Sequence, residues 1–369
     1  MSDLPEVSDL LSLLLNNTPM LDVRAPIEFN QGAFPTSLNV PLLNDNEREQ
    51  VGICYKQQGQ DKAIELGHQL ISGDIKARRL QQWKTFVEQH PDGVLYCFRG
   101  GQRSKISQQW ITENSGVRYP RIRGGYKAMR RFLIDATERL SPIIKPTILS
   151  GRTGTGKTLL IEPMTQAVDL EGLAHHRGSA FGRRVKAQPT QINFEHQLAI
   201  TLLKHEQQGQ LSLLFEDESR NIGSVHLPKI LFDHLTPAPI VVITASVEER
   251  VAISLQTYVI DQHAEFVAHL GSDLGFSQFS ESLLNSIDRV KRRLGGSNHA
   301  SLRAVMEDAL KQQLNRGDMS AHRTWIERLL TEYYDPMYDY QLDKKRDRVC
   351  FEGTQPEVTA YLASQGIAP

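Results

Sequence analysis

The sequence predicts an α/β protein in which two domains each carry a parallel sheet, with a helical part toward the C-terminus. Three observations lead to this fold class. The chain has 369 residues, more than one hydrophobic core usually supports. Short apolar runs typical of buried strands alternate with helical periodicity in both halves of the chain. Finally, Gly151 to Thr158 fits the pattern GxxxxGKT and lies between an apolar strand and a helix.

The composition is that of a globular protein without a strong charge bias. Hydrophobic residues make up 40% and charged residues 23%, and the net charge of −1 gives no overall sign of a nucleic-acid partner. Three cysteines without a CxxC pair argue against a disulfide framework or a zinc site and fit the reducing cytoplasm. Residues 1–15 lack a basic segment and an unbroken apolar run, so we expect no signal peptide and no membrane span.

The first domain, residues 1–137, opens with a short helix over 10–15 and a strand over 20–24. A polar insertion over 44–69 follows. It contains Cys54, which has no cationic or glycine-rich neighbours in sequence. A structural role for this thiol is therefore favoured over a role as a resolving thiol.

The stretch around Cys97 carries the chemistry of this domain. An apolar run over 94–96 predicts a buried strand, and helical spacing over 104–110 follows. Between them lie the cysteine, two glycines, Arg99 and Arg103. Inward-pointing amides, the N-terminus of a helix and two guanidinium groups favour the thiolate form. Cys97 is thus predicted to be a nucleophile in an anion cradle, with a buried inert cysteine as the alternative.

Residues 118–131 carry cations without any acid, and two tyrosines are interleaved. Basic groups with aromatic partners suit a phosphate backbone and unstacked bases, so Arg123 and Lys127 are candidates for contact with RNA. The alternative is a solvated helix face. The six cations are Arg118, Arg121, Arg123, Lys127, Arg130 and Arg131.

A linker over 138–146, marked by two prolines, leads to the second domain over 147–369. A strand over 147–150 precedes the GxxxxGKT loop, and a helix is expected over 159–167. In such a P-loop the glycines let amides approach a diphosphate, the lysine neutralises it and the threonine hydroxyl holds Mg²⁺. The predicted diphosphate-binding residues are Gly151, Gly154, Gly156, Lys157 and Thr158.

A second buried strand over 211–215 ends in acidic residues, and a third strand over 239–244 leads into a helix over 248–255. This order predicts a doubly wound, NTPase-like P-loop sheet. A carboxylate at the end of such a strand commonly serves Mg²⁺, so we expect Asp217, or else Glu216, to act with Thr158. Capping of the next helix is the alternative.

Residues 175–191 contain no acid but several cations and glycines. We expect them to form a lid or groove over a polyanion, with Arg177, Arg183 and Arg184 as RNA-binding candidates. After residue 246 the chain is predicted to be helical up to residue 330. A tyrosine-rich segment over 333–340 either stacks bases or packs between helices.

The string LDVRAPIEFNQGAFPTSLNVPL over 21–42, the Cys97 loop and the Arg123–Gly124–Gly125–Tyr126 segment resemble the rhodanese family over about the first 137 residues. The resemblance implies a parallel sheet and transfer of sulfur or selenium through a cysteine. One departure is the C-x5-R spacing from Cys97 to Arg103, which is similar to that of phosphatases of the same fold. Phosphoester hydrolysis therefore stays open as an alternative at this point.

Over nearly its full length the chain resembles the tRNA 2-selenouridine synthase family, in the strings CFRGGQRS, GRTGTGKT, HRGSAFGRR, QPTQINFE and EDESRNIG. This resemblance implies that wobble 2-thiouridine of tRNA is S-geranylated with geranyl diphosphate. Selenophosphate-derived selenium then replaces the S-geranyl group. Cys97 would carry or position the selenium, with Arg99 and Arg103 on its phosphate.

Under this reading the partners are tRNA, geranyl diphosphate and selenophosphate, with Mg²⁺ as the metal, and we expect a cytoplasmic monomer without a membrane anchor. One alternative is an ATP-dependent kinase or sulfurtransferase with a regulatory rhodanese domain. Another is a non-catalytic RNA-binding scaffold.

Overall fold

The computed structural model describes residues 4–367, which fall into two compact units. The first unit is Met1–Leu140 with Thr190–Lys204, and the second is Ser141–Pro189 with His205–Pro369. The predicted linker over 138–146 is shorter in the structure, because helix α7 (Gly125–Leu140) continues through its start and strand β6 (Lys145–Ser150) begins before its end. Only a short 3-10 turn, Ser141–Ile143, lies between these two elements.

The first unit contains a five-stranded sheet in the order β1-β5-β4-β2-β3. Each neighbouring pair is parallel, which confirms the parallel sheet predicted for this part of the chain. The middle strands are buried along their whole length, as their apolar sequences require. The strands are β1 (Glu6–Val7), β2 (Met20–Asp22), β3 (Ser37–Asn39), β4 (Val94–Tyr96) and β5 (Arg121–Ile122).

Helices surround this sheet, and two of them come from the polar insertion over 44–69. The side chain of Asn44 accepts a hydrogen bond from the amide of Glu47 and starts the first of the two helices. Their apolar residues complete the core that forms around Trp83 and Leu95. The helices are α1 (Leu10–Leu15), α2 (Pro26–Gln31), α3 (Asp45–Gln58), α4 (Gln60–Leu70), α5 (Gly73–Gln89) and α6 (Gln102–Ser115), followed by α7.

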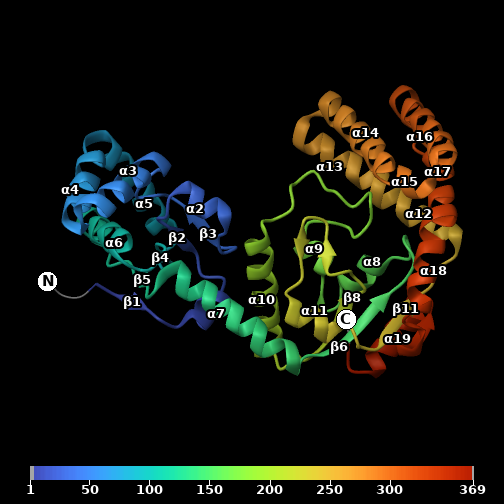
Figure 1. Ribbon diagram of the computed structural model, residues 1–369, viewed down its shortest axis with the longest axis horizontal. Coiled ribbons are helices and arrows are strands. Elements are labelled where there is room, and N and C mark those ends of the chain that lie inside the picture. The colour runs from blue at the N-terminus through green and yellow to red at the C-terminus, as the bar shows by residue number, and fades with distance from the viewer. Residues whose placement is uncertain (1–3, 368–369) are drawn as a thin grey trace. The chain divides into compact units, whose positions relative to one another are not determined.

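Residues 190–204, placed by the sequence in the second domain, belong to the first unit, which corrects the predicted boundary. They form most of helix α10 (Gln191–Gln207), which lies beside α7 in Figure 1. Asn193 accepts a hydrogen bond from the amide of Ala33 at 2.7 Å, and Nδ1 of His196 lies 2.9 Å from the carbonyl of Ala33. These long-range contacts draw the helix to the first sheet, and no local sequence signal reveals them.

The second unit contains a five-stranded parallel sheet in the order β12-β11-β6-β8-β7. This order confirms the doubly wound arrangement around the first strand of the domain. Two of its strands were not predicted: β7, which has only two residues, and β12, which joins the sheet after the long helical segment. The strands are β6, β7 (Ala167–Val168), β8 (Ser212–Glu216), β11 (Ile240–Ile243) and β12 (Val349–Gly353).

The helix expected over 159–167 is much shorter in the structure. Helix α8 covers only Lys157–Ile161, and the chain then turns and forms strand β7. Pro163 follows two residues after the end of α8. Glu162 still has helical angles and donates to the carbonyl of Thr158, but proline has no backbone N–H to continue the helical hydrogen bonds, which explains the early termination.

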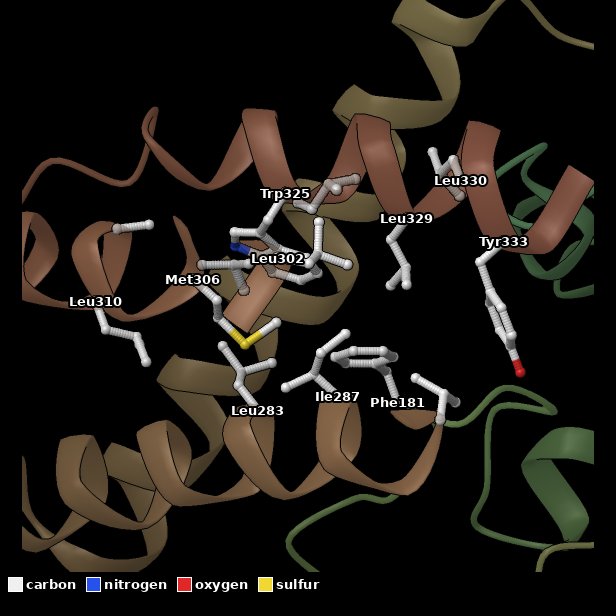
Figure 2. Packing of buried hydrophobic residues seen from close by; sticks show 14 of the residues in the cluster. Phe181, Leu283, Ile287, Leu302, Met306, Leu310, Trp325, Leu329, Leu330 and Tyr333 are labelled. Atoms are coloured by element: carbon white, nitrogen blue, oxygen red, sulfur yellow. The ribbon is translucent and has the colours of Figure 1, made fainter. Parts of the chain in front are cut away.

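A helical region lies between β11 and β12, as expected from the sequence. Its helices α13, α14, α16 and α17 lie together, away from the strands of this unit (Figure 1). Their apolar faces meet around Met306, Trp325 and Leu283, and Phe181 from a distant loop enters the same core (Figure 2). No helix within residues 4–367 is long and apolar enough to cross a membrane.

The helical region consists of α12 (Val247–Leu255), α13 (Asp261–Leu270), α14 (Ser272–Arg289), α15 (Lys291–Leu294), α16 (Gly296–Arg316), α17 (His322–Leu329) and α18 (Asp335–Asp343). The π-helical turns Gln256–Ile260 and Leu330–Tyr334 join α12 to α13 and α17 to α18. The remaining elements of this unit are α9 (Leu170–Leu173), the hairpin β9 (Asn221–Ile222) and β10 (Val225–His226), α11 (Lys229–Leu235), the 3-10 turn Arg346–Arg348 and α19 (Gln355–Ser364).

Candidate functional site

The Cys97 loop connects the end of β4 to the start of α6 and is held against the start of α7. The amide of Tyr126 donates to the carbonyl of Cys97, and the amide of Lys127 donates to the carbonyl of Phe98, each at 2.9 Å. Gly125 has φ +57°, and a Cβ at this position would lie 2.2 Å from the carbonyl oxygen of Cys97. Only glycine permits this close approach. The glycines of the Arg123–Tyr126 segment therefore shape the cysteine loop directly.

The thiol of Cys97 lies inside the first unit, with 3% of the residue exposed. Its sulfur is 3.2 Å from the hydroxyl of Ser104, which in turn donates to the carbonyl of Gly101 at 3.0 Å. Ser104 is thus a direct partner of the thiol that sequence reasoning did not single out, although it lies in the same string. Cys54 is also buried, on α3, in agreement with the favoured structural role.

Of the two arginines in the loop, Arg99 is exposed and Arg103 is paired. The guanidinium of Arg103 donates to both carboxylate oxygens of Glu28, at 2.5 and 3.0 Å. Burial alone would raise the pKa of Glu28, but the hydrogen bond and charge of Arg103 lower it below its usual value. Glu28 takes two of the five donors of Arg103, so others remain for an oxyanion.

The run of cations over 118–131 has acidic partners in the structure, although none lies within the run itself. Arg121 and Arg123 both pair with Glu6, and Arg130 pairs with Glu195 on α10. Acids from other parts of the chain therefore partly offset the positive charge of these arginines. Lys127 is exposed at the start of α7, next to the cysteine loop.

The P-loop of the second unit has the local geometry that its glycines predict. Gly154 and Gly156 have φ of +84° and +83°. A Cβ on Gly154 would lie 2.8 Å from the carbonyl of Arg250. The ammonium of Lys157 donates to the carbonyl of Gly151 at 2.8 Å, which bends the side chain over the loop. Gly151, Gly154, Gly156, Lys157 and Thr158 line a cleft of about 620 Å³.

Asp217 lies directly after β8 and faces this cleft, as predicted. One of its carboxylate oxygens accepts from the hydroxyl of Ser150 and the other from the ammonium of Lys345, both at 2.6 Å. Mg²⁺ prefers oxygen ligands and usually keeps several waters, so Thr158 and a carboxylate with unused lone pairs fit it without a larger acidic cluster. Glu216 is different, because it is buried and accepts from the amide of Glu171.

Two more carboxylates, Glu171 and Glu218, line the cleft with Lys157. Burial, followed by the charge of Glu171, raises the pKa of Glu218 to about 8. Burial also raises the pKa of Glu171, although Lys157 acts against this shift. The sequence gives no warning of Glu171, which lies 45 residues before β8 ends. Of these two carboxyl groups, that of Glu218 favours its protonated form at neutral pH.

The loop over 175–186 is anchored in the structure rather than open. Phe181 is buried, and its ring stacks on that of Trp325 at a centroid distance of 5.7 Å. Arg289 on α14 donates to the carbonyl of Ala180 at 2.8 Å. A Cβ on Gly182 would overlap the carbonyl of Arg177, so this turn requires glycine. The loop is a fixed wall of the cleft.

The cationic candidates of this loop take different positions. The side chains of Arg177 and Arg184 line the P-loop cleft, whereas Arg183 is exposed. The guanidinium of Arg177 lies 5.7 Å from the ring centroid of Tyr258. Burial lowers the pKa of Arg177. Two of the three predicted arginines thus face the P-loop cleft.

The tyrosine-rich segment over 333–340 packs mainly between helices. Tyr334 is buried, and Asp335 accepts from both terminal nitrogens of Arg250 at 2.5 and 2.9 Å. The side chain of Arg250 is itself buried and donates from Nε to the carbonyl of Thr153 in the P-loop. Tyr340 is exposed. The packing alternative therefore holds for the first part of the segment.

The fold and the sites together define a protein of two domains, one with a cysteine loop and the other with a P-loop. The chain belongs to the tRNA 2-selenouridine synthase family. The model of the tRNA 2-selenouridine synthase AAA domain matches residues 144–368, which include the whole P-loop sheet.

Several proteins named tRNA 2-selenouridine synthase are similar to the chain over almost its full length. The protein of Marinobacter nauticus is 50% identical over 365 residues, which cover 99% of both chains. That of Sulfurovum sp. is 46% identical and covers 98% of this chain and 99% of its own. That of Pseudomonas fluorescens Pf-5 is 51% identical, with coverage of 97% and 98%. These matches include both units.

Proposed function

We propose that this protein converts wobble 2-thiouridine of tRNA to 2-selenouridine in two steps at two anion-binding loops. The first step is S-geranylation by geranyl diphosphate, and the second is replacement of the S-geranyl group by selenium from selenophosphate. The observation that carries the proposal is the presence of a P-loop cleft in one unit and a cysteine loop in the other. One loop suits a diphosphate, and the other suits a nucleophile and an oxyanion.

In the first step the sulfur of 2-thiouridine attacks the allylic carbon of geranyl diphosphate, and the carbon–oxygen bond breaks with its electron pair on the diphosphate. Lys157 has three N–H donors and uses one on Gly151, so two can follow the charge that develops on the leaving group. Mg²⁺, held by Thr158 and Asp217, would neutralise further charge there. Arg177 and Arg184 extend the positive lining of the same cleft.

In the second step S-alkylation has made the sulfur a good leaving group. Cys97 positions the selenium of selenophosphate for attack on the base, and the free donors of Arg103 with Arg99 hold the phosphate of selenophosphate. Ser104 orients the thiol through its hydroxyl. Lys127 and Arg123, at the start of α7, contact the RNA beside this loop. Because the proposed substrate is tRNA, we also propose a cytoplasmic location, with a monomer as the active form.

The test separates the two steps with paired variants. Lys157→Ala should abolish S-geranylation of 2-thiouridine tRNA yet still selenate tRNA that is already geranylated. Cys97→Ser should still S-geranylate 2-thiouridine tRNA but should fail to selenate geranylated tRNA. The matched controls are Lys229→Ala and Cys54→Ser, which change a lysine and a cysteine outside both loops. Nucleoside mass spectrometry after incubation with geranyl diphosphate and then selenophosphate measures both products.

Loss of S-geranylation in Cys97→Ser would contradict this division of the two steps. ATP turnover by the wild-type protein without tRNA, together with no nucleoside product, would instead favour the ATP-dependent kinase with a regulatory domain.

A further inference from the structure

An apolar cavity of about 280 Å³ lies within the first unit, and neither anion-binding step uses it. Two of its walls are the helices of the polar insertion, and the third is α6, which starts at the cysteine loop. Almost all of its lining is hydrocarbon. The side chains that form these walls include Val51, Tyr55, Ala63, Ile64, Ile106 and Trp110.

The cavity adjoins the cysteine loop. Arg103 lines it, and the next residue, Ser104, is the hydrogen-bond partner of the Cys97 thiol. Leu42 and Leu43 line the cavity and belong to the same packed cluster as Cys97. A ligand that fills the cavity therefore has one end close to the thiol and to the guanidinium that Glu28 holds in place.

The shape of α4 keeps the cavity open. Gly67 faces it, and a Cβ on this residue would meet only one atom within 4 Å, Cγ2 of Val51 at 3.9 Å. The wall is thus bare backbone at this point, in a helix where most other residues would be favoured by propensity. Arg103 is the only charged side chain among the lining residues described. A nucleobase or a diphosphate would find few polar partners, whereas a hydrocarbon chain attached to a polar group matches both ends.

We propose that this cavity holds the geranyl chain of S-geranyl-2-thiouridine while selenium replaces sulfur on the base. The inference rests on the proposed function and places its apolar leaving group. The selenium of selenophosphate forms the C2–Se bond with its own electron pair. The C2–S bond breaks, and its pair leaves on sulfur as geranylthiolate, which takes a proton from water. Water then cleaves the Se–P bond, which leaves phosphate and 2-selenouridine.

The experiment compares two tRNAs, one with S-geranyl-2-thiouridine and one with S-methyl-2-thiouridine at the wobble position, as substrates for selenation by the full chain. Gly67→Leu fills the cavity, and Gly52→Leu makes the same change on α3, where a Cβ meets nothing within 4 Å and the cavity is not touched. Gly67→Leu should raise the KM for the S-geranyl tRNA about tenfold, since about two methylene groups lose their burial. Gly67→Leu should leave the KM for the S-methyl tRNA unchanged. Gly52→Leu should leave the KM for both tRNAs unchanged.

Binding of the S-geranyl-2-thiouridine nucleoside, measured by calorimetry without selenophosphate, gives a readout that does not depend on turnover. Gly67→Leu should weaken it about tenfold. Should that variant fail to fold, Ile64→Gln places a polar group at the half-buried wall of the cavity and should weaken binding likewise. Unchanged binding and KM in both variants would overturn the cavity assignment alone. Failure of the wild-type protein to selenate S-geranyl tRNA would overturn the proposed function instead.

Discussion

Replacement of Phe181 by alanine tests whether the loop over 175–186 is a fixed wall of the P-loop cleft. The side chain is 4% exposed and inserts among α14, α16 and α17, where its ring stacks on Trp325 (Figure 2). Truncation of a buried phenylalanine removes its burial and leaves a cavity, which together cost about 3 kcal/mol or more. We expect Phe181→Ala to lower the free energy of unfolding by about 3 kcal/mol.

Urea denaturation followed by tryptophan fluorescence measures this change, because Trp325 reports on the same cluster. Leu314→Ala on α16 is the control. Its side chain is 65% exposed, so the expected change stays within about 0.5 kcal/mol. The same Phe181→Ala protein should also bind tRNA more weakly, since Arg177 and Arg184 lose the anchored backbone that aims them into the cleft. A loss below about 1 kcal/mol with unchanged tRNA affinity would refute the anchored-wall interpretation.

Two further predictions concern titratable groups. Burial lowers the pKa of His322 to about 4, and its Nδ1 accepts from the indole of Trp325, so the folded protein requires the neutral ring. Because the unfolded chain binds this proton first, stability should fall by about 3 kcal/mol as the pH drops from about 6.5 to 4. Urea midpoints at the two pH values should differ less in His322→Gln, and equal pH dependence would count against this role. Glu28→Gln removes the partner of Arg103 and should cost about 2 kcal/mol, discounted for partial exposure of the pair. Because the folded-state pKa of Glu28 is lowered, this contribution is present at neutral pH and is lost as the pH falls. The control is Glu65→Gln, in an exposed pair with Lys62, which should leave the urea midpoint unchanged. Equal midpoint shifts in the two variants would contradict the prediction.

Features that depend on neighbours along the chain could be predicted from the sequence. The P-loop is one, because the positive φ of Gly154 and Gly156 and the position of Lys157 are local requirements of a strand, loop and helix. The buried strand before Cys97 and the parallel sheets also followed from short apolar runs. Pro163 is a local stop signal that accounts for the end of α8 at Ile161, so this boundary too is encoded by neighbours in the chain.

Contacts between groups far apart in the chain could not be predicted and are seen only in the folded protein. Glu6 and Glu195 neutralise arginines that lie in an acid-free run, and Glu28 pairs with Arg103 across 75 residues. Strand β12 joins β11 after more than a hundred intervening residues, and the polar insertion over 44–69 supplies walls of an apolar cavity. Each of these contacts depends on how the chain packs in space. Hydrophobic burial and charge pairing stabilise whichever groups come close in the folded chain, and the local periodicity of the sequence does not identify those partners.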